Sequence, residues 1–191
     1  MNFIPNEETE KLLRSMWLGF TDKSFDAKGK AWSFTGSPYI SKVGGNGADS
    51  VVFDGSTTIS ASFTGLNFQN TQINFDLQLT ERGGTILNCA DFNLSTDANG
   101  NILFNSNTVK STWNLAPNVR NTFSVRFQYA SANRSTIFYV YFNGDSPSIA
   151  SGSLENSSKQ VSAINLTIGE GLKGFISNFS VVTDGNVISQ F

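Results

Sequence analysis

The polar and apolar positions of the stretch 122–145 predict a pair of long strands. In 122–129 apolar residues alternate with polar ones, among them Arg126 and Gln128, and this period of two is typical of a strand with one buried and one solvated face. Every residue of 137–142 is apolar or aromatic, which indicates a strand that is covered on both faces or carries an aromatic outer surface. We therefore expect these two segments to form an antiparallel hairpin.

Shorter strand patterns continue on both sides of this hairpin. The segment 70–80 alternates Ile, Phe and Leu with Asn, Asp and Gln, so it predicts a half-exposed strand. Turn signals such as Asp54-Gly55 and Asn143-Gly144 separate the short apolar runs, because these residue types adopt positive φ at low cost. The Ser- and Gly-rich segment 146–160 is expected to be a loop. Since an isolated hairpin is marginally stable in water, the other runs should supply the rest of its sheet.

The first 15 residues differ from the rest of the chain. Five charged residues lie between Glu7 and Arg14 around two leucines, and Pro5 suits the first turn of a helix. We expect a short helix or an extended arm in 1–15, followed by one domain in 16–191. Two interpretations of the arm stay open: a terminus packed loosely on the domain, or a segment that docks on a neighbouring subunit.

The composition favours a single all-β domain. Of the 191 residues 39% are hydrophobic and only 15% are charged, and the chain contains 17 Phe and 17 Gly. A core of aromatic side chains with turns of small polar residues fits these numbers, and the length suits one domain. We therefore expect a β-sandwich of two packed antiparallel sheets.

Charge and hydropathy argue against several kinds of partner. The net charge of −2 comes without the clustered Lys and Arg that phosphate backbones require. No apolar run approaches the roughly 20 residues that cross a bilayer, and the N-terminus has neither the basic start nor the apolar segment of a signal peptide. The sequence thus predicts no nucleic-acid partner, no membrane insertion and no signal-directed export.

Most catalytic and metal sites lack the residues they need. The chain has no His and a single Cys, so zinc sites and His-based triads have neither ligands nor a base. Glycoside hydrolysis needs two carboxylates about 5–9 Å apart, but the Glu residues lie in the arm or in expected loops and no two carboxylates share a strand face. We expect no enzymatic activity and no cofactor. A single calcium ion held by main-chain carbonyls with Asp97 or Asp145 is the one metal site left open.

Several motifs in a fixed order resemble the concanavalin A-like jelly roll in its laminin-G-like (LamG-like) form. The motifs are MWLGF at 16–20, DAKGK at 26–30, VVFDG at 51–55, INFDLQL at 73–79 with GGTIL at 83–87, VYFNG at 140–144, and LTIG at 166–169 with GFISNFSV at 174–181. The resemblance covers about 16–191 and implies a jelly-roll sandwich. The Asp-x-x-Gly-Lys-x-Trp pattern at 26–32, followed by GSP at 36–38, is similar to LamG-like domains of tailed-bacteriophage virion proteins.

The resemblance implies a non-catalytic structural or adhesive protein of a virion, such as a capsid decoration, tail or fibre component made in the host cytoplasm. Its expected partners are other virion proteins, further copies of itself, and a glycan on a host surface. The alternative is a lectin-like carbohydrate-binding module unrelated to a virion. A glycan hydrolase is the least favoured function, because the sequence lacks paired acids.

The same resemblance implies which residues would meet a ligand. Its strand-end pattern turns Phe138, Val140 and Phe142 toward the core, so Ile137, Tyr139 and Tyr141 lie on the opposite face, together with Arg126 and Gln128. Tyr rings offer flat surfaces for a sugar, and Arg and Gln offer donors that fix its orientation. The other interpretation is that these tyrosines pack under a loop or against a neighbouring subunit.

Overall fold

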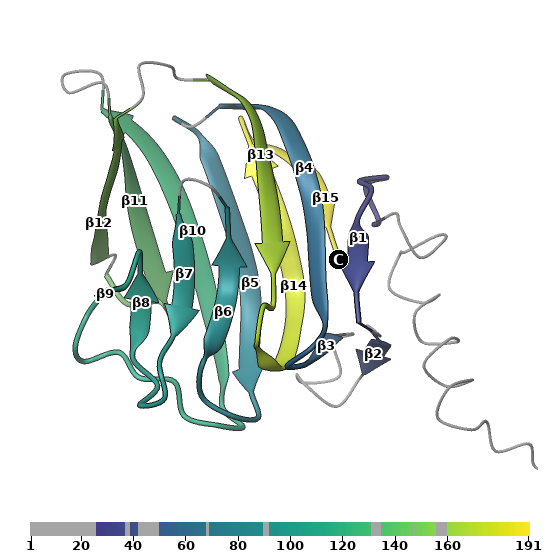
Figure 1. Ribbon diagram of the computed structural model, residues 1–191. Helices are drawn as coiled ribbons and strands as arrows, with labels where there is room; N and C mark the ends of the chain where they lie inside the picture. The colour runs from purple at the N-terminus through teal and green to yellow at the C-terminus, as the bar shows by residue number, and fades with distance from the viewer. Residues whose placement is uncertain are drawn as a thin grey trace, which may run out of the picture.

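The computed structural model describes residues 26–36, 39–41, 50–67, 69–89, 92–130, 135–146, 148–155 and 160–191. Within these ranges every regular element is a β-strand, and the strands form two antiparallel sheets packed face to face (Figure 1). The expected two-sheet antiparallel sandwich is therefore confirmed. No helix of the described ranges is long and apolar enough to cross a membrane. The expected arm in 1–15 lies outside the described residues, and its boundary with a domain in 16–191 stays a prediction.

The sheet at the front of Figure 1 has seven strands in the order β1-β4-β13-β6-β7-β8-β9. Its strands are β1 (Ser33–Thr35), β4 (Thr58–Asn67), β13 (Gln160–Ile168), β6 (Gly84–Asn88), β7 (Asn93–Thr96), β8 (Ile102–Phe104) and β9 (Asn107–Thr108).

The sheet behind it has eight strands. Seven follow the order β12-β11-β10-β5-β14-β3-β2, and the eighth, β15, pairs with β14. Its strands are β12 (Ser148–Glu155), β11 (Ser135–Phe142), β10 (Arg120–Ala130), β5 (Thr71–Leu79), β14 (Lys173–Thr183), β3 (Ser50–Asp54), β2 (Tyr39–Ser41) and β15 (Asn186–Gln190).

The hairpin expected from the sequence is formed by β10 and β11. The two strands pair in register from Phe123 opposite Phe142 to Ala130 opposite Ser135. One expectation about its surroundings is wrong, because 148–155 is not a loop but the edge strand β12, which pairs with β11. Its Ser- and Gly-rich composition carries almost no strand signal, and the pairing comes from the backbone groups that β11 offers along its free edge.

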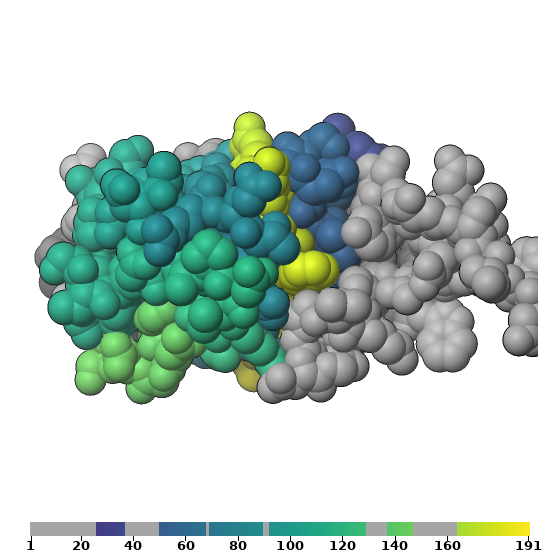
Figure 2. Space-filling model, turned by 90° about the horizontal axis from the view of Figure 1, so that it is seen from below, coloured from purple at the N-terminus to yellow at the C-terminus, as the bar shows by residue number. Residues whose placement is uncertain are grey.

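The turn that closes β11 explains the VYFNG motif. Asn143 and Gly144 adopt φ values of 49° and 78°, which these two residue types reach with little strain. The Asn143 side chain also accepts a hydrogen bond from the Thr122 amide (2.8 Å) and donates one to Oδ1 of the buried Asn121 (2.9 Å). Figure 2, which looks along the strands, shows this turn in light green beside the teal loop that leads into β10. The motif therefore fixes the end of the hairpin.

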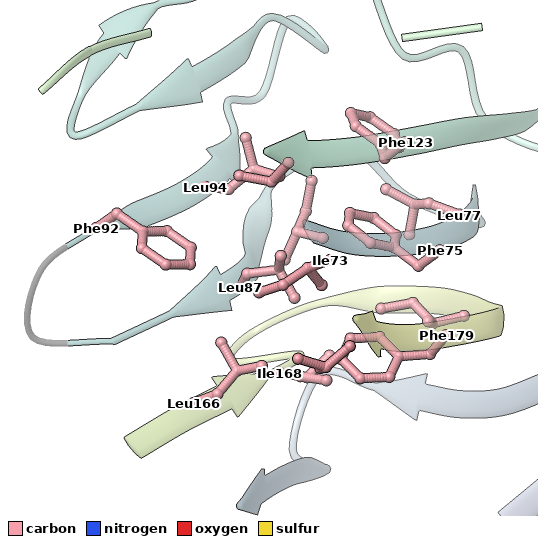
Figure 3. Close-up of a cluster of buried hydrophobic side chains, with 14 of the residues drawn as sticks. Ile73, Phe75, Leu77, Leu87, Phe92, Leu94, Phe123, Leu166, Ile168 and Phe179 are labelled. Atoms are coloured by element: carbon pink, nitrogen blue, oxygen red, sulfur yellow. The ribbon is translucent and has the colours of Figure 1, made fainter. Parts of the chain in front are cut away.

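The core lies between the sheets and is built mainly from aromatic and aliphatic side chains. The alternation in 71–79 is confirmed on this side, since Ile73, Phe75, Leu77 and Leu79 are all buried. Phe75 stacks on Phe123 of the next strand with ring centroids 5.0 Å apart. Figure 3 shows residues of both sheets meeting in this layer, among them Ile73, Phe75, Leu77, Phe123 and Phe179 from one sheet and Leu87, Phe92, Leu94, Leu166 and Ile168 from the front of the molecule.

The Asp-x-x-Gly-Lys-x-Trp motif forms a tight loop that is hydrogen-bonded to the C-terminal strand β15. Both oxygens of the buried Asp26 carboxylate accept hydrogen bonds: Oδ1 from the amides of residues 28 and 30 (2.8 and 3.0 Å), and Oδ2 from Trp32 Nε1 (3.1 Å). Oδ2 also accepts from the Ser189 hydroxyl and the Gln190 amide. Trp32 then packs edge-on against Phe63, Phe179 and Phe191. The motif is therefore explained by packing.

Candidate functional site

The candidate site lies on the outer face of the eight-stranded sheet, the face that points away from the core. On β11, Phe138 and Val140 are fully buried and Phe142 is 7% exposed, so the orientation implied by the resemblance is confirmed. Because side chains alternate along a strand, Ile137, Tyr139 and Tyr141 occupy the outer face. All three are half-buried.

The structure brings the sequence-predicted ligand residues together on two neighbouring strands. Arg126 of β10 lies directly opposite Tyr139, and Gln128 lies opposite Ile137. Both Arg126 and Gln128 are exposed. We call Ile137, Tyr139, Tyr141, Arg126 and Gln128 the aromatic patch. Directly opposed side chains on one sheet face lie about 4.5–5.5 Å apart at Cβ, so the patch is one continuous surface.

Two amide side chains of β5 extend the aromatic patch across the sheet. Gln72 lies opposite Arg126 on its other side, and Asn74 lies opposite Ser124. Gln72 Nε2 donates to Asn74 Oδ1 (2.5 Å), and Asn74 Nδ2 donates to the Ser180 hydroxyl of β14 (3.3 Å). This uncharged row offers amide and hydroxyl groups beside the tyrosines.

The outer side of β10 also holds polar atoms that lack partners. Of the three buried side-chain polar atoms without a hydrogen bond in the described ranges, two belong to this strand: Arg120 Nε and Ser124 Oγ. Buried polar atoms are normally paired, so an unpaired one calls for an explanation. Ser124 lies opposite Tyr141, which places its unpaired hydroxyl at the border of the aromatic patch.

Next to the patch, hydrogen-bonding side chains gather around one buried carboxylate, and no pattern in the sequence predicts this cluster. Asp76 was expected on the solvated side of a half-exposed strand, but it is only 6% exposed. Its carboxylate accepts hydrogen bonds from the Arg120 guanidinium, from the Thr122 hydroxyl (2.8 Å) and from Asn178 Nδ2 (2.5 Å). Burial raises the pKa of Asp76, but these bonds and the positive charge of Arg120 outweigh burial, so its pKa lies below the ordinary 3.8.

The geometry of β14 brings Asn178 into this cluster. The pairing of β14 with β5 shifts register between Ser177 and Ser180, and Asn178 at this bulge has a φ of 52°. A bulge re-aims one side chain, which here reaches Asp76. Asn is a residue type that tolerates positive φ, but its sequence position alone carries no signal for the bulge. The alternation in 70–80 placed Asp76 on the outer face, and only the strand pairing shows which cation meets it.

The outer face offers no pair of acids for glycoside hydrolysis on its central strands. Asp76 is the single acidic residue of β5, and the sequences of β10, β11 and β14 contain none. The Asp76 carboxylate is held by Arg120, whose Nη2 forms an ion pair with it. Two carboxylates that act as acid and base or nucleophile must flank one bond, and these four strands do not provide them.

The two acids considered for calcium are engaged in other bonds. Asp97 Oδ1 accepts from the amides of Asn99 and Asn101 (2.8 and 2.9 Å), and its Oδ2 accepts from Asn101 Nδ2 (2.8 Å). Asp145 Oδ2 accepts from Trp113 Nε1 (2.6 Å) and lies 3.8 Å from Lys110 Nζ. The described residues contain no group of three or more His, Cys, Asp or Glu side chains placed to hold a metal ion. Hydrogen bonds therefore already orient both carboxylates toward groups of the protein.

Comparison with known proteins identifies the fold. The sequence matches no family model and no curated protein. Domain 4 of AbnA, a GH43 extracellular arabinanase from Geobacillus stearothermophilus solved in complex with arabinotriose, matches with a TM-score of 0.59 at 11% identity, over 86% of this chain and 85% of that one. The receptor binding domain of botulinum neurotoxin mosaic serotype C/D matches with a TM-score of 0.52 at 13% identity, over 86% of this chain and 44% of that one. At such identities the similarity establishes the β-sandwich fold alone.

Proposed function

We propose that the protein is a non-catalytic carbohydrate-binding module and that its glycan lies on the aromatic patch. The observation that carries this proposal is the arrangement of Tyr139 and Tyr141. Both rings are half-buried on an outer sheet face, beside the exposed Arg126 and Gln128. This arrangement combines apolar ring surface with neighbouring polar donors, which is the combination that small-molecule sites use for affinity and orientation.

The chemistry of the patch suits a sugar. A pyranose or furanose ring has an apolar face of C–H groups and a rim of hydroxyls. Tyr is amphipathic, so its ring can cover the C–H face while its hydroxyl exchanges hydrogen bonds with the rim. The amides of Gln128 and Gln72 can pair with sugar hydroxyls on either side. A sheet face holds these groups more rigidly than a loop would, which lowers the entropy lost on binding.

The fold supports the same proposal at the level of analogy. The arabinanase domain that shares this sandwich was solved with arabinotriose bound. A shared fold does not transfer a function, so the weight rests on the patch itself. The absence of a second acid on the central strands of the outer face favours binding without hydrolysis.

Calorimetry with purified oligosaccharides tests the proposal. A panel of arabinotriose and other neutral and acidic oligosaccharides, chosen after a glycan-array screen, should contain at least one ligand. The double variant Tyr139→Ala/Tyr141→Ala should abolish this binding while circular dichroism stays that of the wild type. Phe175→Ala is the matched control. Phe175 of β14 lies opposite Gln78, so its half-buried side chain is on the same outer face of the sheet as the two tyrosines but outside the aromatic patch. Unchanged binding in the folded double variant would rule out this face.

We further propose, from the sequence resemblance, that this module serves as an adhesive or structural part of a virion made in the host cytoplasm, with other virion proteins and copies of itself as partners. Deleting 1–15 should then leave the sandwich folded and weaken self-association or incorporation into particles. Light scattering coupled to gel filtration, on the full chain and on the truncated chain, measures the self-association. A truncated chain that fails to fold would assign the segment to the core.

A further inference from the structure

We propose that the glycan bound at the aromatic patch carries a carboxylate, and that Arg126 binds this carboxylate through its guanidinium. This inference rests on the proposed function, because it names the class of sugar for the same surface. It starts from a difference between the two arginines on the outer side of β10.

Arg120 and Arg126 share one strand face but differ in their partners. The guanidinium of Arg120 is neutralised by the buried Asp76 carboxylate. Arg126 is exposed, and no hydrogen bond or ion pair engages its guanidinium within the described part of the chain. The protein therefore supplies an anion for one arginine of β10 and leaves the other without one.

The neighbours of Arg126 on the sheet are all uncharged. Its cross-strand neighbours are Tyr139 on β11 and Gln72 on β5, and the next outward positions along β10 are Ser124 and Gln128. A cation held on a rigid sheet face among neutral hydroxyl, amide and aromatic groups has a local electrostatic preference for an anion. None of these four neighbours can satisfy that preference.

The geometry of the guanidinium selects the kind of anion. Its planar fork matches a carboxylate through two parallel N–H···O bonds. With Tyr139 directly opposite, a sugar ring on the tyrosine can direct a ring-attached carboxylate toward Arg126. Gln72 and Gln128 flank this position and can pair with the adjacent hydroxyls. Uronic acids and sialic acids both carry a carboxylate attached directly to the sugar ring.

The charge distribution disfavours densely sulfated glycans. Polyanions are bound by clusters of Lys and Arg, whereas the aromatic patch contains one cation. The chain as a whole has a net charge of −2, so long-range attraction does not draw an anion to it. Recognition has to come from contact at Arg126, which fits one carboxylate on one sugar residue of the glycan.

Two matched pairs of oligosaccharides test this inference by calorimetry at low salt. The first pair is trigalacturonic acid and its methyl ester, and the second is 3′-sialyllactose and lactose, so the two arms separate uronic from sialic acid. In at least one pair the acid should bind about 10-fold more tightly than the neutral partner, since a charge-assisted bidentate contact is stronger than a neutral one. Arg126→Gln should remove this preference.

Lys28→Gln is the matched control, because it removes one positive charge at an exposed position outside the patch and should keep the preference. Equal affinity for acid and neutral partners, or a preference that survives Arg126→Gln, would overturn the carboxylate proposal. In that case the proposed function would still stand if neutral sugars bind to the wild type and this binding is lost in Tyr139→Ala/Tyr141→Ala. No binding of any probe of the array or of either pair would overturn both.

Discussion

At the scale of single residues, buried carboxylates hold distant parts of this protein together. Asp26 is 2% exposed and accepts five hydrogen bonds, from its own loop, from Trp32 and from strand β15. Asp76 plays a similar part on the outer face, where it joins β5, β10 and β14. A buried carboxylate is stable when hydrogen bonds compensate its lost hydration. These two acids are therefore structural groups, although their sequence context resembles that of a polar loop and of a solvated strand face.

Replacing Asp26 should destabilise the protein strongly. Asp26→Ala is expected to lower the free energy of unfolding by about 3 kcal/mol, because it leaves Trp32 Nε1 and several amides without an acceptor. Ser189→Ala removes one of the five donors and should cost about 1 kcal/mol. Urea titrations measure both values. Equal losses for the two variants would contradict a central role for the carboxylate.

Among the strands, β10 shows how one element has a packing face and an outer face. Phe127 is fully buried, and its ring centroid lies 5.1 Å from that of Phe138 and 5.5 Å from that of Phe92. The next residue, Gln128, is exposed. Adjacent residues lie on opposite faces because side chains alternate along a strand with a period of two.

This division predicts different outcomes for two neighbouring substitutions. Phe127→Ala should lower the free energy of unfolding by about 3–5 kcal/mol, since it opens a cavity among the aromatic rings. Gln128→Ala should change it by less than about 0.5 kcal/mol, because surface substitutions are usually nearly neutral. Denaturant titrations of the two variants are the measurement. A Phe127→Ala variant within about 0.5 kcal/mol of the wild type would show that the strand faces the other way.

The connection between β13 and β14 depends on a glycine. Gly169 has a φ of 89°, and a Cβ built on it would lie 2.0 Å from the Phe53 ring. Gly169→Ala should therefore destabilise the fold severely, through both the backbone strain and the clash. Gly185 has a φ of 77°, and no atom lies within 4 Å of a Cβ built on it. Gly185→Ala therefore introduces the backbone strain without a clash. Thermal unfolding should show the larger drop in Tm for Gly169→Ala, and equal drops would exclude a role for the contact with Phe53.

At the scale of the whole molecule, lowered carboxyl pKa values make stability depend on pH. The Ser56 amide, together with the Ser56 hydroxyl and the Thr57 amide, lowers the pKa of Asp54 from 3.8 to about 2 against a smaller opposing effect of burial. Hydrogen bonds from the Asn101 side chain and nearby amides lower the pKa of Asp97, and Asp76 is also lowered. The folded state prefers all three groups ionised.

Acid should therefore weaken the fold in a defined window. A carboxyl whose folded pKa is depressed contributes stability that is fully present above its unfolded pKa and is lost as the pH falls toward its folded pKa. For Asp54 this window runs from about pH 4 to about pH 2. Asp54→Asn keeps an oxygen acceptor but does not titrate, so the stability difference between wild type and variant should shrink across this window. A difference that stays constant in urea titrations at pH 4, 3 and 2 would contradict the assignment.

Local patterns in the sequence predict many of the strands and the direction of many side chains. The alternation in β5 and β10, and the Asp54-Gly55 and Asn143-Gly144 turns, depend on interactions between residues close in the chain. Periodicity and turn chemistry are therefore visible in the sequence. The same alternation, together with the strand-end pattern of the resemblance, predicted that Tyr139, Tyr141, Arg126 and Gln128 share one face.

Long-range packing determines which strands are neighbours and which polar groups come into contact. The edge strand β12 has little strand propensity of its own and forms because β11 offers a backbone to pair with. Asp76 meets Arg120 and Asn178 across two different strand pairs, and the bulge in β14 aims Asn178 at it. The Asp26 carboxylate accepts a hydrogen bond from Ser189, which lies 163 residues away in the sequence. Contacts this distant depend on the order of strands in the sheets, which no local pattern of the chain encodes.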